Sequence, residues 1–112
     1  MRLDLKEEKR YQRHMRDDYD CAVNSRVCCR PIVVTKLNHD EESWIGNSIT
    51  LCRRHATGDY ETSLASLGRK DFEALFELDL AAIAEWCNWD FDGQLAFGEA
   101  PKGVNYPKGA QP

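Results

Sequence analysis

The segment Leu51-Cys52-Arg53-Arg54-His55 is the most informative part of this sequence, because it places a cysteine and a histidine three residues apart. At the start of a helix this spacing brings both side chains to one side of the first turn. Zinc takes four sulfur or nitrogen ligands in a tetrahedron, usually two from each of two segments. The segment therefore predicts half of a structural zinc site, on a short helix capped by Thr50.

The other half of the site must come from the upstream cysteines Cys21, Cys28 and Cys29. We expect Cys21 and Cys29 to complete it, and we do not expect Cys28 and Cys29 to bind together, because adjacent side chains diverge. Which of these two neighbours binds stays open. The alternative is a metal-free helical domain whose cysteines are small buried apolar residues. We expect this core role for Cys87, on the apolar stripe of a later helix.

Length and composition limit the class of protein. The chain has 112 residues, which fits one domain, and five cysteines, which is a high count for this size. No run of about 18 apolar residues exists, so no membrane span is expected. The first residues lack the apolar stretch of a signal peptide. We therefore expect a cytoplasmic protein, where cysteines more often bind metals or fill cores than form disulfides.

Besides the short helix that carries Cys52 and His55, two longer helices and a short strand are expected along the chain. Residues 3–18 are rich in good helix formers, and the β-branched run 32–35 is the best strand candidate. A weaker second strand is expected within residues 38–50. Residues 70–87 have the apolar spacing of one long amphipathic helix. These elements predict an α+β domain over residues 1–92, with a motif core at 21–60 and a flexible Gly- and Pro-rich tail at 93–112.

Charge is distributed unevenly. Residues 21–70 have a net charge of +2, whereas residues 71–112 have a net charge of -6. Phosphate neutralisation by basic side chains dominates nucleic-acid affinity. The candidates for such contacts lie around the predicted zinc site: Arg26, Arg30, Arg53 and Arg54.

The order of residues in this region resembles the HNH, or ββα-metal, nuclease motif of small proteins encoded by lambdoid phages and prophages. His39 follows the predicted strand, Asn47 comes eight residues later, and Leu51 and Cys52 open a Leu-Cys-x-x-His segment. The likeness covers about residues 18–87. It implies a small treble-clef or ββα-metal-like zinc domain, flanked here by an N-terminal helix and a long C-terminal helix.

The resemblance also implies a role for each matching residue. His39 would be the general base that activates water, and Asn47 would orient it through the loop. The structural zinc would be held by the set Cys21, Cys29, Cys52 and His55. A catalytic Mg or Mn ion needs a further ligand, and Ala56 stands where such families often have a histidine. Asp59 is the nearest candidate for that second metal.

Two functions follow from these expectations. The first is a metal-dependent DNA endonuclease of HNH type. The second is a non-catalytic zinc module that binds a protein or nucleic-acid partner, namely DNA or a DNA-binding protein, with the acidic C-terminal helix as its interaction face. A second metal near His39 would distinguish the nuclease from the module.

Overall fold

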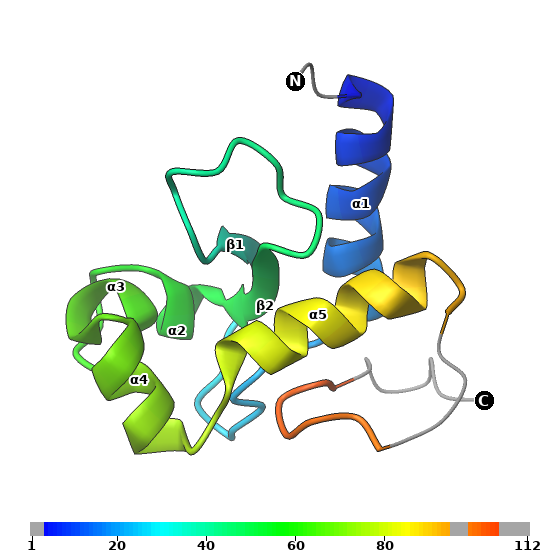
Figure 1. Cartoon of the computed structure of the whole chain (residues 1–112). Coiled ribbons are helices and arrows are strands. Elements are labelled where there is room, and N and C mark those ends of the chain that lie inside the picture. The colour runs from blue at the N-terminus through cyan, green and yellow to red at the C-terminus, as the bar shows by residue number, and fades with distance from the viewer. Residues whose placement is uncertain (1–3, 95–98, 106–112) are drawn as a thin grey trace.

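The computed structural model describes residues 4–94 and 99–105, and over these residues the chain is an α+β domain. Figure 1 shows a central hairpin with α1 on one side and a group of short helices on the other. Helix α5 runs from the short helices past the hairpin to α1. The described elements, in chain order, are α1 (Leu5–Asp18), β1 (Ile32–Lys36), β2 (Ser48–Cys52), α2 (Arg53–Ala56), α3 (Leu64–Leu67), α4 (Arg69–Phe76) and α5 (Leu80–Phe91).

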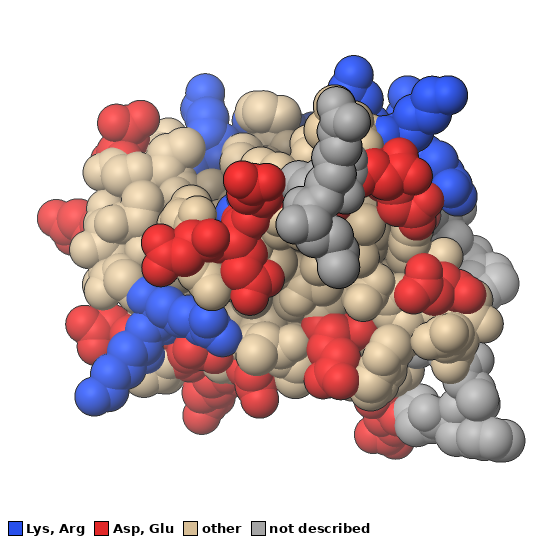
Figure 2. Space-filling view, turned by 45° about the horizontal axis from the view of Figure 1, so that its top comes forward, with Lys and Arg blue, Asp and Glu red and all other residues tan. Residues whose placement is uncertain are grey.

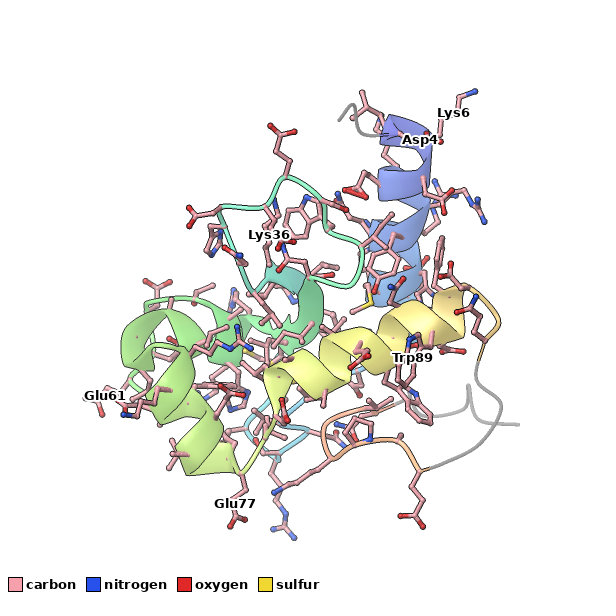
Figure 3. All side chains as sticks on the ribbon, viewed as in Figure 1. Asp4, Lys6, Lys36, Glu61, Glu77 and Trp89 are labelled. Atoms are coloured by element: carbon pink, nitrogen blue, oxygen red, sulfur yellow. The ribbon has the colours of Figure 1, made fainter. Side chains whose placement is uncertain are left out.

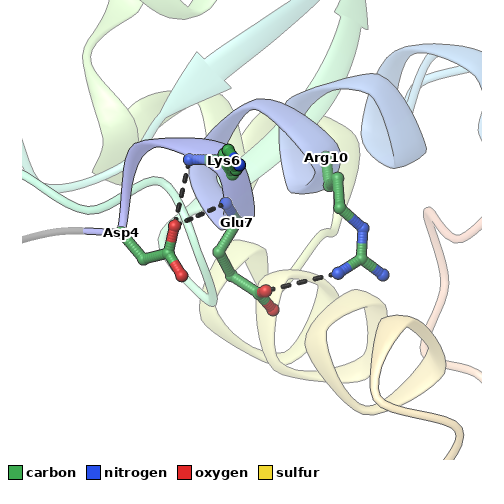
Figure 4. A network of polar contacts seen from close by, with 4 residues as sticks. All are labelled: Asp4, Lys6, Glu7 and Arg10. Carbon is green, nitrogen blue, oxygen red and sulfur yellow. Dashed lines mark hydrogen bonds and ion pairs between the residues drawn. The ribbon is translucent and has the colours of Figure 1, made fainter.

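Helix α1 confirms the helix predicted over residues 3–18. Its N-cap is Asp4, whose carboxylate accepts hydrogen bonds from the backbone N–H groups of Lys6 at 3.1 Å and Glu7 at 3.2 Å. Glu7 in turn lies 3.4 Å from Arg10 (Figure 4). The other face of the helix buries Tyr11 and Met15. Because Asp4 sets the first residue of the helix, it also sets which residues lie on this buried face.

The two strands form an antiparallel hairpin in which Val34 pairs with Thr50. Strand β1 confirms the predicted run, and β2 is fully buried. The expectation that Thr50 caps a helix is wrong, because Thr50 lies within β2 and its hydroxyl donates to the carbonyl of Asp20 at 2.8 Å. The N-cap position of α2 is Cys52 instead.

The single helix predicted over residues 70–87 is wrong, because the structure breaks it into α4 and α5. Glu77 has the left-handed conformation, with φ of 55°, and ends α4. Asp79 then caps α5 by accepting from Ala82 N–H at 3.1 Å. The side chain of Glu73 accepts from Leu80 N–H at 2.9 Å and so joins the two helices. Asp at such a position favours a new cap over a continued helix.

The core lies where α1 and α5 pack on the buried strand β2, and Phe72 of α4 belongs to the same core. Its largest buried side chains are Tyr11, Tyr19, Phe72, Met15, Ile49, Leu51, Leu80 and Ile83. Cys87 is only 2% exposed and belongs to this core, as expected. Within the described ranges, no helix is both long and apolar enough to cross a membrane.

Residues 99–105, which fall within the predicted flexible tail, pack against the domain, and we call this segment the C-terminal strap. The backbone carbonyl of Asn105 accepts from Asp20 N–H at 2.7 Å. Gly103 is buried beside Leu78 and Ile83. Residues 95–98 and 106–112 of the predicted tail lie outside the described residues.

Candidate metal centre

Four side chains from three parts of the chain converge on one point: Cys21, Cys28, Cys52 and His55. Their ligand atoms all lie within 4.8 Å of one another. Cys21, Cys52 and His55 are buried, and Cys28 is half-buried. A closed set of three sulfurs and one imidazole is the donor chemistry of a structural zinc site.

The distances inside this group fit a tetrahedron around zinc. The Nδ1 atom of His55 lies 3.1 Å from Cys52 Sγ, 3.5 Å from Cys28 Sγ and 3.6 Å from Cys21 Sγ. Bond lengths of about 2.3 Å to sulfur and about 2.0 Å to nitrogen place tetrahedral S and N ligands about 3.5 Å apart. The three distances from His55 Nδ1 therefore agree with a tetrahedral zinc site.

Secondary structure positions three of the four ligands. Cys52 ends β2, and His55 lies one turn later in α2. Cys21 is fixed beside β2 because the N–H of Ala22 donates to the carbonyl of Thr50 at 2.9 Å. The ring of Phe76, from α4, packs edge-on against the His55 ring at a centroid distance of 5.4 Å.

A turn positions the fourth ligand. The backbone N–H of Cys28 donates to the carbonyl of Ser25 at 3.2 Å, and the N–H of Ser25 donates to Cys28 Sγ at 3.2 Å. The turn thus points the sulfur of Cys28 inward and gives it a hydrogen-bond donor.

The structure corrects the expected pairing of Cys21 with Cys29, since it brings Cys28 to the group instead. Cys29 is directed elsewhere: its carbonyl accepts from Arg53 N–H at 3.2 Å, and its thiol contacts the Arg53 guanidinium, whose pKa is raised by the hydroxyl of Tyr60 and by that thiol. Spacing could not distinguish the two neighbours. The turn-forming Ser25, three residues before Cys28, was the signal that favoured Cys28.

The surroundings of Cys21, Cys52 and His55 shift the pKa values of these side chains in the absence of metal. Burial raises the pKa of the Cys21 thiol to about 12. Burial acts in the same direction on Cys52, but N–H groups of Cys29 and His55 and the neighbouring thiols outweigh it and lower the pKa of that thiol. Burial, and secondarily Arg54, lowers the pKa of His55, which favours the neutral imidazole that a metal requires.

The predicted catalytic residue His39 is exposed and lies outside the Cys/His group. It borders a hollow of about 380 Å³ between the hairpin and the short helices, lined by Thr35, Lys36, Leu37, His39, Ala56, Leu64, Ala65 and Arg69. His39 and Ala56 thus face the same hollow. None of these lining residues is a carboxylate, and Asp59 is exposed and not among them.

Asn47 is buried and holds the loop that carries His39. Its side chain accepts from Asn38 N–H at 2.8 Å and donates to the carbonyls of Asn38 at 2.9 Å and Ser43 at 3.0 Å. Lys36, which ends β1 and is labelled in Figure 3, also contacts this loop: its ammonium lies 5.0 Å from the centre of the Trp44 ring and donates to the carbonyl of Glu42 at 3.0 Å. The loop before β2 is therefore a fixed part of the domain.

The predicted phosphate-binding arginines belong to the two segments that carry the Cys/His group. Arg26, Arg30 and Arg53 are exposed, and Arg54 is half-buried with its guanidinium 4.9 Å from the centre of the Tyr60 ring. On the face drawn in Figure 2, acidic side chains are scattered among uncharged surface and do not merge into one patch.

No protein-family model, curated protein or solved structure matches this chain. The class of protein that the fold and the site define is an α+β domain with a Cys3His group that can bind zinc.

Proposed function

We propose that this chain is a non-catalytic zinc module of treble-clef type. The segment 21–31 acts as the zinc knuckle, the hairpin β1–β2 follows it, and α2 supplies the last ligand. The convergence of Cys21, Cys28, Cys52 and His55 carries the proposal. When bound, zinc supplies a cross-link between the knuckle and the hairpin, and such a link adds folding free energy to a small domain.

We propose further that the module binds nucleic acid through the arginines of the knuckle and α2. Residues 21–39 contain no Asp or Glu. The N–H of Arg53 donates to the carbonyls of Cys29 and Pro31, so the start of α2 lies against the knuckle segment that carries Arg30. Arg30 and Arg53 make no ion pair among the described residues, whereas Arg10, Arg16 and Arg69 each do. The Arg53 guanidinium contacts the Cys29 thiol and the Tyr60 hydroxyl but stays exposed, so both guanidinium groups can contact phosphates.

The acidic region formed by α4 and α5 is less suited to be the interaction face, because several of its carboxylates make hydrogen bonds or ion pairs within the domain. Glu73 accepts from Leu80 N–H and pairs with Arg69, and Asp79 caps α5. Asp90 accepts a short hydrogen bond from the hydroxyl of Tyr19. These contacts explain part of the acidic charge as helix capping and packing.

Fluorescence anisotropy with a labelled DNA duplex, measured over a series of salt concentrations, tests the proposal. Removing one phosphate contact reduces the slope of log K against log salt by about 1, so the slope of the Arg30→Gln/Arg53→Gln variant should fall by about 2. The Arg10→Gln/Arg13→Gln variant removes the same charge from α1 and should behave as the unmodified chain. Equal effects of the two variants, or no binding at low salt, would contradict the proposal.

The HNH-type nuclease is the second candidate, favoured by the shared hollow of His39 and Ala56 and by the hold of Asn47 on the loop. Plasmid cleavage with Mg or Mn tests it. Cleavage that His39→Ala abolishes would support the nuclease. If the chain is a binding module, no cleavage should occur and no second metal ion should bind. The Ala56→His variant, which adds a second imidazole beside His39, should then gain such a metal site.

A further inference from the structure

The C-terminal strap reaches the backbone of a predicted zinc ligand. The side-chain N–H₂ of Asn105 donates to the carbonyl of Cys21 at 2.9 Å and to the carbonyl of Ala22 at 3.3 Å. The backbone carbonyl of Asn105 accepts from Asp20 N–H at 2.7 Å. One residue of the strap thus fixes three consecutive residues centred on the first ligand.

The strap is itself held firmly on the core. Gly103 is buried, and a Cβ atom there would lie 2.5 Å from Ile83 Cδ1 and 3.1 Å from Leu78 Cδ2. A turn closed by Val104 N–H and the carbonyl of Pro101, at 3.2 Å, directs the chain from this contact to Asn105. The position of Asn105 is therefore determined by packing on α5 and not by the knuckle alone.

Cys21 needs this support because it precedes the hairpin and lies in no helix or strand. The other backbone hydrogen bonds of residues 20–22 are the N–H of Cys21 to the Asp20 carboxylate at 2.8 Å, the N–H of Ala22 to the carbonyl of Thr50 at 2.9 Å and the hydroxyl of Thr50 to the carbonyl of Asp20 at 2.8 Å. Groups that orient a metal ligand without touching the metal typically change metal affinity by 10- to 100-fold.

We infer that Asn105 is a positioning residue of the zinc site, and that the strap tunes its metal affinity by holding Cys21 in place. The inference rests on the proposed zinc binding. It assigns a role in the metal site to a residue 50 positions beyond the last ligand, His55.

The test is the zinc affinity of the full chain, measured by competition with a chromophoric chelator. Asn105→Asp keeps the shape of the side chain but replaces the donor with an acceptor facing two carbonyls. We expect it to weaken zinc binding by about 10- to 100-fold. Glu99→Ala, which removes an exposed side chain of the same strap, should leave the affinity unchanged.

A second measurement separates positioning from general stability. The urea midpoints of Asn105→Asp and of the unmodified chain should coincide without zinc and separate as free zinc rises, because bound zinc stabilises the variant with the larger Kd less. An equal deficit at every zinc concentration, or unchanged zinc affinity, would overturn the inference while leaving the zinc module intact. A full chain that binds no zinc would overturn both.

Discussion

The Nδ1 atom of His55 lies 3.5 Å from the Sγ atom of Cys28, a residue 27 positions earlier in the chain. This contact closes the knuckle onto α2, and it places both residues in the group that also contains Cys21 and Cys52. A metal bound there joins segments that are distant in the sequence, so its role in this account is structural. Removing it therefore has measurable consequences for stability.

Chelation of zinc should destabilise the domain. A ligand that binds only the folded state stabilises it by about 4 kcal/mol when its free concentration is a thousand times its Kd. Urea unfolding with and without a chelator should therefore give well-separated midpoints. Cys52→Ser, which removes a ligand, should show one midpoint under both conditions. Coincident midpoints for the unmodified chain would argue against a structural metal.

Asn47→Asp should lower the free energy of unfolding by about 2 to 4 kcal/mol, because a buried carboxylate would face the carbonyls of Asn38 and Ser43, to which the amide now donates. Asn38→Asp is the matched control, since Asn38 is exposed and its side-chain oxygen only accepts, from Asp40 N–H. Urea denaturation of both variants measures the difference. Equal stability of the two would show that the Asn47 amide does not hold the loop.

Gly103→Ala should destabilise the chain by about 2 to 3 kcal/mol, through overpacking against Ile83 and a φ of +104° that L residues rarely adopt. Gly93→Ala separates the two causes. Gly93 also has a positive φ, of +70°, but no atom lies within 4 Å of the place that a Cβ would take, so this variant should cost about 1 kcal/mol. Thermal unfolding measures the stability of both variants. An unchanged stability of Gly103→Ala would mean that the strap is not packed on α5.

Alkaline pH should weaken the fold through Cys87. Burial raises the pKa of this thiol from 9.0 to about 12. Above pH 9 the unfolded chain therefore loses a proton that the folded chain retains, so stability that is complete below pH 9 falls by about 1.4 kcal/mol per pH unit as pH rises toward 12. Cys87→Ala lacks this thiol, so its stability should fall less steeply between pH 8 and pH 10 in urea titrations of the zinc-loaded protein. Parallel profiles would contradict the shift.

Local patterns in the sequence predict much of this fold. Helix α1 and strand β1 follow from residue propensity and periodicity, and the Cys52 and His55 pair follows from spacing within one turn. These signals involve neighbours in the chain, so they need no knowledge of tertiary contacts.

The remaining features depend on tertiary contacts or on turn geometry, which the spacing of apolar residues and cysteines does not reveal. The choice of Cys28 over Cys29 depends on a turn that starts at Ser25. The break between α4 and α5 depends on the left-handed Glu77, which the apolar stripe of residues 70–87 conceals. The hydrogen bond from Asn105 to the carbonyl of Cys21 joins residues that lie 84 positions apart in the sequence.

The most direct test of the zinc site is the metal content of the purified chain, measured by elemental analysis for the unmodified protein, Cys28→Ser and Cys29→Ser. The structure predicts about one zinc per chain in the unmodified protein and in Cys29→Ser, and its loss in Cys28→Ser. Zinc that is absent from the unmodified protein, or that is lost in Cys29→Ser and retained in Cys28→Ser, would contradict the account.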